Sequence, residues 1–286
     1  MALRRAGLAA LFVTLAAAGS ACGAREPAAP GLPGPKQSIP RDPAALATAL
    51  TQNTRALRTA IDRWRTDGGP SRGAAPREVV LRALYHQRIH ILLSDRPRLA
   101  CATIHRLPGT LAAEARDLVA ARRALVRLTP TTRRRRFRTG PALPAGRLLR
   151  YYRQAERRFG VSRRVLAAVN LVETGFNRLR SRSTAGAQGP MQFLPATWRV
   201  YGLGGDIHDP HDAILGAANY LHASGAPGSY RRALHSYNPS ALYVSAVLHY
   251  ARAMRRSVDT YYTLHSWQVF VRTTHGLHRL TGPRPR

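Results

Sequence analysis

Residues 162–177 read SRRVLAAVNLVETGFN and contain the clearest helical pattern in the chain. Ser162 is a residue type that caps helix N-termini, and Gly175 is the type that ends helices. The apolar residues between them recur at helical spacing and form one stripe: Val165, Leu166, Val169 and Val172. Glu173 follows this stripe directly. The segment therefore predicts a helix whose last turn holds a carboxyl group at the edge of a buried face.

A carboxyl group in the position of Glu173 loses hydration and faces the negative end of the helix dipole. Both effects favour the protonated form, which a general acid near neutral pH requires. The other acidic residues after residue 118 are Glu156, Asp206, Asp209, Asp212 and Asp259. None of them adjoins a long apolar stripe. We therefore interpret Glu173 as the candidate catalytic acid, against the alternative that it is an ordinary exposed acid at a helix end.

The composition describes a folded and strongly basic protein. The 286 residues include 45 basic and 14 acidic side chains, for a formal net charge of +31, and 44% are hydrophobic. This apolar content supports one or two folded domains and excludes a wholly disordered chain. The basic residues are spread along the chain without aromatic residues interleaved on one face. We therefore expect adsorption to anionic polymers of any kind, including those of cell walls, and no specific nucleic-acid partner.

The first 22 residues have the pattern of an export signal. Two arginines precede an uncharged apolar run that is too short for a transmembrane helix, and small residues then precede Cys22. The site resembles a bacterial lipoprotein signal, although Gly19 stands where Leu is usual. We expect an exported protein of the cell wall or extracellular space, which contacts the membrane only through its signal or through a lipid on Cys22. The alternative is an unmodified Cys22, free to form a disulfide with Cys101.

The rest of the N-terminal half divides into linkers and helices. Residues 23–42 are rich in Pro and Gly and predict a linker. Residues 43–128 predict a helical accessory region with a structural or targeting role. Its expected helices span 43 to about 67, from about 76, and about 110–128. Cys101 is expected to be a buried apolar side chain there. Residues 129–145 combine prolines with four consecutive arginines and predict a second, basic linker.

Residues 146–256 have sharper apolar periodicity and contain every motif to which we assign chemistry. Residues 257–286 form a C-terminal extension. In this extension, residues 260–263 and 267–271 are aromatic and β-branched, a composition that predicts a short extended pair.

Four ordered motifs within about 146–256 resemble those of the lysozyme-like lytic transglycosylases, bacterial enzymes that cleave peptidoglycan. ETGFN at 173–177 resembles the segment of the catalytic glutamate. STAGAQGPMQ at 183–192 resembles the glycine-rich stretch, and its GPMQF wording is most similar to the soluble and membrane-bound B-type members. AANYL at 217–221 and SYN at 236–238 resemble the two motifs that line the glycan cleft.

The sequence departs from the family pattern around the catalytic segment. Thr174 stands where most members have Ser, and Arg178 stands where Pro is common. The interval from Glu173 to Ser183 is one residue longer than in many relatives. These differences concern the loop that follows the helix and remove no group that the chemistry requires.

The resemblance implies an all-α, lysozyme-like catalytic domain; the small helical region predicted above precedes it, and the extended pair predicted for the C-terminal extension would follow it as a short β-hairpin. It also implies non-hydrolytic cleavage of the β-1,4 bond between N-acetylmuramic acid and N-acetylglucosamine, with 1,6-anhydromuramyl ends as products. Glu173 would act first as acid and then as base on peptidoglycan glycan strands. The implied substrate-binding residues are Ser183, Met191, Gln192, Asn219, Tyr237 and Asn238.

Several alternatives stay open from the residues alone. Met191 and Tyr237 are also ordinary core residues, and a Gly-Pro pair is common in turns. The chain could be a muramidase-type hydrolase, which would need a second acid such as Asp206, or a non-catalytic glycan-binding module. Asp209 and Asp212 lie near two histidines, but their spacing is that of a helix start, so we expect no metal and no cofactor.

Overall fold

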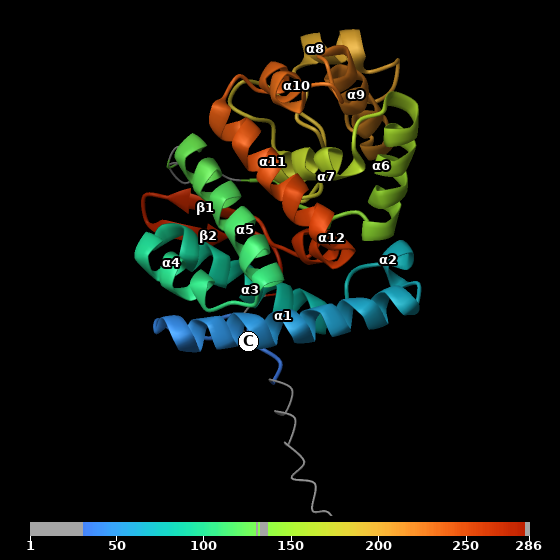
Figure 1. Cartoon of the computed structure of the whole chain (residues 1–286). Helices are drawn as coiled ribbons and strands as arrows, with labels where there is room; N and C mark the ends of the chain where they lie inside the picture. The colour runs from blue at the N-terminus through green and yellow to red at the C-terminus, as the bar shows by residue number, and fades with distance from the viewer. Residues whose placement is uncertain (1–30, 130, 132–136, 284–286) are drawn as a thin grey trace, which may run out of the picture.

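The computed structural model describes residues 31–129, 131 and 137–283. Within them the chain forms twelve helices and one antiparallel hairpin (Figure 1). The helices are α1 (Pro43–Thr66), α2 (Gly69–Arg72), α3 (Arg77–Asp95), α4 (Pro97–His105), α5 (Gly109–Leu128), α6 (Ala145–Phe159), α7 (Arg163–Thr174), α8 (Pro195–Tyr201), α9 (Pro210–Ala223), α10 (Tyr230–Tyr237), α11 (Ala241–Arg256) and α12 (Val258–His265). The strands are β1 (Phe270–Thr273) and β2 (Gly276–Arg279). The mainly helical fold class is confirmed. The predicted signal segment 1–22, with Cys22, and the run of four arginines lie outside the described residues.

The helices α1, α3 and α5 lie close to their predicted positions, because their capping and periodicity are local. Asp42 accepts hydrogen bonds from the amides of Ala44 and Ala45 at 3.0 and 2.8 Å, as expected for an N-cap. The sequence interpretation missed α2 and α4, which are short. No helix in the described part of the chain is long and apolar enough to cross a membrane.

Two expectations about single segments were wrong. Residues 260–263 are not extended but belong to α12, which Ser257 caps by accepting from the amide of Asp259. Tyr262 packs edge-on against Trp64 at 5.7 Å, so tertiary packing overrides local β propensity here. The hairpin forms later, from β1 and β2, and pairs Phe270 with Arg279. Cys101 is exposed rather than buried, since the buried positions of α4 are Ala100, Thr103 and Ile104.

One hydrophobic core joins the N-terminal helices to residues 146–256. It includes Leu57 and Ile61 from α1, Leu118 from α5, and Leu166 and Val247 from α7 and α11. Figure 1 shows α5 lying along α11, and these two helices are in extensive contact. A second, smaller cluster lies among α1, α3, α4 and α5. The N-terminal region therefore supports α11 directly.

An ion-pair cluster strengthens the contact between α5 and α11. Asp117 on α5 is 4% exposed. Its carboxylate lies 2.8 Å from His249 Nδ1, 2.9 Å from Arg256 Nη2 and 3.4 Å from Arg252 Nη1. Three donors from one helix thus share one buried acceptor, which makes the packing of the two helices directional.

Two buried imidazoles on α3 lie against Trp267 of the C-terminal extension. His86 and His90 are both fully buried, and their ring centroids are 4.3 Å apart. Trp267 lies about 6 Å from both rings, at 5.9 and 6.0 Å. Both nitrogens of His86 and Nε2 of His90 lack hydrogen-bond partners among the described residues. Burial lowers the pKa of His90 to about 4 and that of His86 well below its ordinary value. Arg58 from α1 and Arg122 from α5 act in the same direction.

We predict from this pair that the protein loses stability in mild acid. The unfolded chain takes up protons near pH 6.5, whereas folded His90 takes one up only near pH 4. Stability is therefore fully present above about pH 6.5 and falls as the pH decreases toward 4. Thermal unfolding of the double variant His86→Leu/His90→Gln should show a flatter dependence of Tm on pH over this range.

The control is His275→Gln/His278→Gln, which removes two exposed histidines of the hairpin. This control should show the same dependence of Tm on pH as wild type. Equal slopes in wild type and in the buried-pair variant would contradict the assignment.

Candidate active site

The position of Glu173 follows from how α7 begins and ends. Ser162 accepts from the amide of Arg164 at 3.3 Å, and Gly175 ends the helix with a left-handed φ of +61°. A Cβ at Gly175 would lie 3.1 Å from the Val269 side chain, so glycine suits both the backbone angle and this close approach. Val165, Leu166 and Val169 are buried as predicted, and the half-buried Glu173 lies in the last turn beside them.

The carboxyl group of Glu173 has one hydrogen-bond partner among the described residues. Tyr243, in the first turn of α11, donates from its hydroxyl to Glu173 Oε1 at 2.7 Å and is 1% exposed. Burial raises the pKa of Glu173 to about 7, while this hydrogen bond acts in the opposite direction. Glu173 is thus protonated in part near neutral pH. A group in this state can both donate and accept a proton.

Sequence reasoning did not find Tyr243. It follows Glu173 by 70 residues, and its only local signal is an aromatic residue three positions after Ser240, the N-cap of α11. That pattern is common in helices that contribute to a core. Its role depends on the packing of α11 against α7, which no local pattern shows.

The predicted residue Tyr237 stacks on Tyr243. Their ring centroids are 6.4 Å apart and the rings are nearly parallel, at 5°. The Tyr237 hydroxyl donates to the carbonyl oxygen of Met191 at 2.6 Å. Burial raises the pKa of Tyr237 well above its ordinary value, and the nearby Glu173 adds to the shift. Tyr237 therefore stays a neutral donor that connects α10 to the glycine-rich loop.

The aromatic row continues outward from Tyr237. Tyr220 on α9 lies 5.5 Å from the Tyr237 ring, and Tyr201 stacks on Tyr220 at 4.5 Å. Both outer tyrosines are half-buried. Tyr220 also donates to the carbonyl oxygen of Ser236 at 2.7 Å. Four tyrosines thus form a continuous aromatic row that ends at the hydrogen-bond partner of Glu173.

A buried polar network ties the end of α7 to the glycine-rich loop. Asn170 accepts from the Tyr152 hydroxyl at 2.7 Å and donates to Asn177 Oδ1 and to the Pro190 carbonyl, both at 2.9 Å. Thr174 donates to the same Pro190 carbonyl at 2.8 Å. The hydroxyl of Thr174 can make this contact as Ser would, which explains why the substitution is compatible with the site. The network holds the helix end and the loop in one geometry.

The glycine-rich loop approaches its neighbours too closely for other residues. Gln188 and Phe193 exchange two backbone hydrogen bonds at 2.9 Å. Between them Gly189 has a φ of +76°, and a Cβ there would lie 1.9 Å from the Ile207 carbonyl oxygen. Glycine is therefore required at this position by both backbone angle and space.

Met191 and Gln192 lie beside Tyr237 but in different environments. Met191 is fully buried, which agrees with a place in the floor of the site and equally with a core role. Gln192 is half-buried and has a positive φ of +51°, uncommon for a residue with a side chain. Its side chain donates to the Gly189 carbonyl at 3.0 Å. Backbone strain of this kind is often found at functional sites.

The remaining predicted residues make no hydrogen bond to Glu173 within the described part of the chain. Ser183 is exposed, and its hydroxyl accepts from the amide of Ala187 at 2.9 Å. Asn219 donates to the Tyr201 carbonyl at 3.1 Å, which supports the outer end of the tyrosine row. Asn238 is the half-buried C-cap of α10. The structure thus brings Tyr237 and Met191 to Glu173 through Tyr243. The substrate-binding roles of all six residues stay predictions.

The acidic residues before α9 have structural partners. Asp209 caps α9 as predicted and accepts from the amides of His211 and Asp212 at 2.8 and 3.0 Å. Asp206 accepts from the amide of His208, and Asp212 accepts from that of Asp206. Asp209, His211 and Asp212 place ligand-type atoms within 4.8 Å of one another. Their mutual contacts explain this clustering without a metal. None of these carboxylates shares a hydrogen bond with Glu173 in the described part of the chain.

Comparison with known proteins gives one family match. Residues 150–258 match the family model of the transglycosylase SLT domain. This range includes Glu173, Tyr243 and all six predicted substrate-binding residues. No solved structure matches the chain.

We predict that Glu173→Gln stabilises the fold, and does so more as the pH rises. The raised pKa of Glu173 means that its favourable contribution is fully present below about pH 4.5 and is lost as the pH rises through about 7. Glutamine does not ionise and can still accept from Tyr243. The Tm of the variant, measured by calorimetry, should therefore exceed that of wild type by an amount that grows up to about pH 7.

The matched control is Glu156→Gln, which removes an ion pair to Arg163 of 2.8 Å. It should give no gain in Tm at neutral pH. If the difference in Tm between Glu173→Gln and wild type were independent of pH, the assignment of a raised pKa to Glu173 would be wrong.

Proposed function

Residues 150–258 belong to the transglycosylase SLT domain family, which is lysozyme-like and helical, and on that basis we propose a specific reaction for this protein. It cleaves the β-1,4 bond between N-acetylmuramic acid and N-acetylglucosamine in peptidoglycan strands without water and leaves 1,6-anhydromuramyl ends. The observation that supports this proposal most directly is a carboxyl group of pKa about 7 whose one hydrogen-bond partner among the described residues is a neutral tyrosine.

The surroundings of Glu173 favour a reaction that needs one carboxyl group. Hydrolysing glycosidases generally use two, roughly 5 to 9.5 Å apart, as acid and as nucleophile or base. Here burial desolvates the carboxyl group of Glu173, and its one hydrogen-bond partner among the described residues is the Tyr243 hydroxyl. The other acids, Asp206, Asp209 and Asp212, are engaged in turn and cap contacts. This arrangement supports a lytic reaction over a muramidase-type hydrolysis.

The proposed proton cycle balances within the site and the substrate. Protonated Glu173 donates to the glycosidic oxygen, and the bond from the muramyl C1 breaks with its electron pair on that oxygen. The acetamido oxygen of the substrate stabilises the electron-poor C1. The Glu173 carboxylate then removes the proton of the C6 hydroxyl, whose oxygen bonds to C1. Glu173 ends protonated, as it began, and no water is consumed.

Tyr243 has a proposed role in the second half of this cycle. Its hydroxyl donates to Glu173 Oε1, and burial raises its pKa well above the ordinary value, so it does not ionise in competition with the carboxyl group. A donor of this kind stabilises the carboxylate that forms when the proton leaves. Tyr243 is thus a positioning residue that also limits how far burial raises the pKa of Glu173.

We also propose that the protein works outside the cytoplasmic membrane, because its first 22 residues resemble an export signal. A net charge of +31 would then hold it near the anionic polymers of the wall. A lipid on Cys22 would add a membrane anchor, with residues 23–42 as the tether.

The first test of this function is Glu173→Gln on purified sacculi. Loss of the general acid should lower the rate of muropeptide release by at least about 100-fold. Wild type should release products one water lighter in mass than those of a hydrolase, with no new reducing ends. Undiminished release by the variant, or reducing ends in the wild-type digest, would contradict the proposal. The Tm of the variant verifies that it is folded.

A second test concerns Tyr243→Phe. Removing the hydrogen bond removes the contact that lowers the pKa of Glu173, so that pKa should rise. Since activity needs the protonated carboxyl, kcat/KM of wild type should fall as the pH increases through about 7. In the variant this decline should move to higher pH, with a lower kcat because the carboxylate is less stabilised.

The matched control is Tyr85→Phe, which also loses one tyrosine hydrogen bond, to the Ser38 carbonyl, but lies in the N-terminal helices. Its pH profile should match that of wild type. An unshifted profile in Tyr243→Phe would show that Tyr243 acts only in packing.

A further inference from the structure

A groove of about 530 Å³ lies where α1 and α2 meet α6 and α12. None of the site residues described above lines it. The polar residues that line it are Asp62, Arg65 and Thr66 on α1, Ser71 on α2, Arg150 and Arg153 on α6, and Tyr262 on α12. The groove thus lies on the seam between the N-terminal region and the SLT domain.

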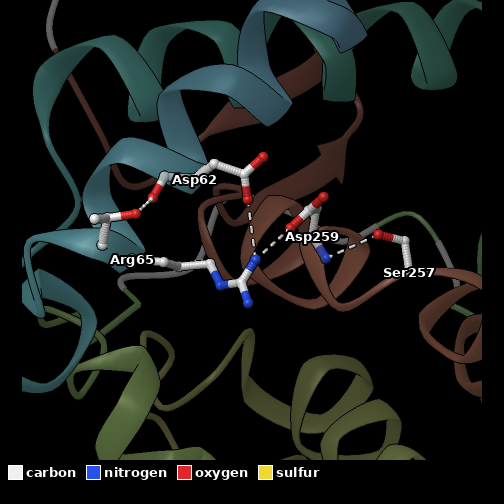
Figure 2. A network of polar contacts seen from close by, with 5 residues as sticks. Asp62, Arg65, Ser257 and Asp259 are labelled. Carbon is white, nitrogen blue, oxygen red and sulfur yellow. Dashed lines mark hydrogen bonds and ion pairs between the residues drawn. The ribbon is translucent and has the colours of Figure 1, made fainter.

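The guanidinium of Arg65 is held in place by carboxylates from two helices. Its Nη1 lies 3.0 Å from Asp62 Oδ1 and 3.1 Å from Asp259 Oδ1. Asp259 is itself oriented by Ser257, whose hydroxyl accepts from the Asp259 amide. Figure 2 shows both ion pairs on one terminal nitrogen, while the other terminal nitrogen points away from the two carboxylates. The acids therefore fix the guanidinium, which also lies 5.6 Å from the centroid of the Tyr262 ring, and its second terminal nitrogen makes no ion pair among the described residues.

Helix α6 adds two further guanidinium groups to the lining of the groove. Arg150 and Arg153 are both exposed and lie three residues apart on α6. Arg150 Nη1 lies 3.4 Å from the Ser71 hydroxyl, and Arg153 has no ion-pair or hydrogen-bond partner in the described part of the chain. Of the residues that line the groove, three are cationic and one, Asp62, is anionic. A concave site with an excess of one charge concentrates its field and attracts counter-ions.

The arginine and serine donors of the groove suit an anionic ligand with several acceptor oxygens, such as a phosphate group. Guanidinium forks match the oxygen atoms of phosphate, and the serine hydroxyl can donate as well. A flexible polymer chain can follow the groove from Arg65 on α1 to the exposed Arg150 and Arg153 on α6, since all three side chains line it. A polymer with repeated phosphodiesters could place successive charges along the groove.

We propose that this groove binds the phosphodiester groups of an anionic wall polymer. Assigning the polymer to the wall rests on the proposed function, but binding itself can be measured without it. Occupancy would bridge α1 and α2 to α6, so a ligand should also raise the Tm of the protein.

The test uses the full chain and poly(glycerol phosphate) as probe, at physiological ionic strength. Arg150→Ala/Arg153→Ala should weaken the Kd about tenfold, since two phosphate contacts are lost. Arg157→Ala/Arg158→Ala makes the same change in net charge on the same helix, outside the groove lining. It should change the Kd less than about twofold. Arg150→Lys/Arg153→Lys keeps the charge and should give an intermediate loss, because lysine lacks the fork.

Three outcomes would overturn the proposal. They are no binding of the polymer by wild type, equal weakening in the two alanine pairs, or binding of phosphatidylglycerol vesicles in place of the polymer with the same dependence on Arg150 and Arg153. Tm measurements show whether each variant is folded. If Arg150→Ala/Arg153→Ala does not fold, the Kd of Arg150→Lys/Arg153→Lys tests the proposal in its place.

Failure of this proposal can be told from failure of the proposed function. Arg150→Ala/Arg153→Ala should digest sacculi stripped of phosphate polymers at the wild-type rate. Glu173→Gln should bind poly(glycerol phosphate) with wild-type Kd. Loss of activity in the arginine pair on stripped sacculi would contradict a separate binding site.

Discussion

The desolvation of one carboxyl group is the constraint on which the rest of this structure depends. Glu173 is held partly protonated near neutral pH because apolar side chains replace the water that would stabilise its charge. This desolvation requires that α7 pack into the core up to its last turn and end directly after Glu173. Leu166 and Val169 provide the anchor, and Gly175 provides the stop. The hydrogen bond from Tyr243, the one that Glu173 makes among the described residues, lowers the pKa that burial raises.

The buried polar network around Asn170 and Thr174 joins the end of α7, which carries Glu173, to the glycine-rich loop. Asn170 and Thr174 both reach the Pro190 carbonyl, so the helix end and the glycine-rich loop cannot move independently. The Met191 carbonyl then accepts from Tyr237, which stacks on Tyr243. The loop, α10 and α11 are thus connected to the same carboxyl group. Such a network is stable only when its members are satisfied together, which favours one geometry over several.

The N-terminal helices and the C-terminal extension support the candidate active site through contacts with α11 and with the end of α7. Asp117 ties α5 to α11, the helix that carries Tyr243. Gln87 on α3 exchanges two hydrogen bonds with the backbone of Gln268, at 2.7 and 2.8 Å. The next residue, Val269, lies against Gly175 at the end of α7. The region first interpreted as an accessory is therefore in physical continuity with the candidate active site.

The sequence by itself determined the helices with strong periodicity and caps, the place of Glu173 at the end of one of them, and the family to which the motifs point. These features are local, because spacing, capping residues and glycine positions act within one or two turns. Only the tertiary structure decided that residues 260–263 are helical, that Cys101 is exposed, and that Tyr243 is the partner of Glu173. Each of these depends on which distant surfaces pack together. Burial and pKa follow from that packing, so no pattern within a single segment can specify them.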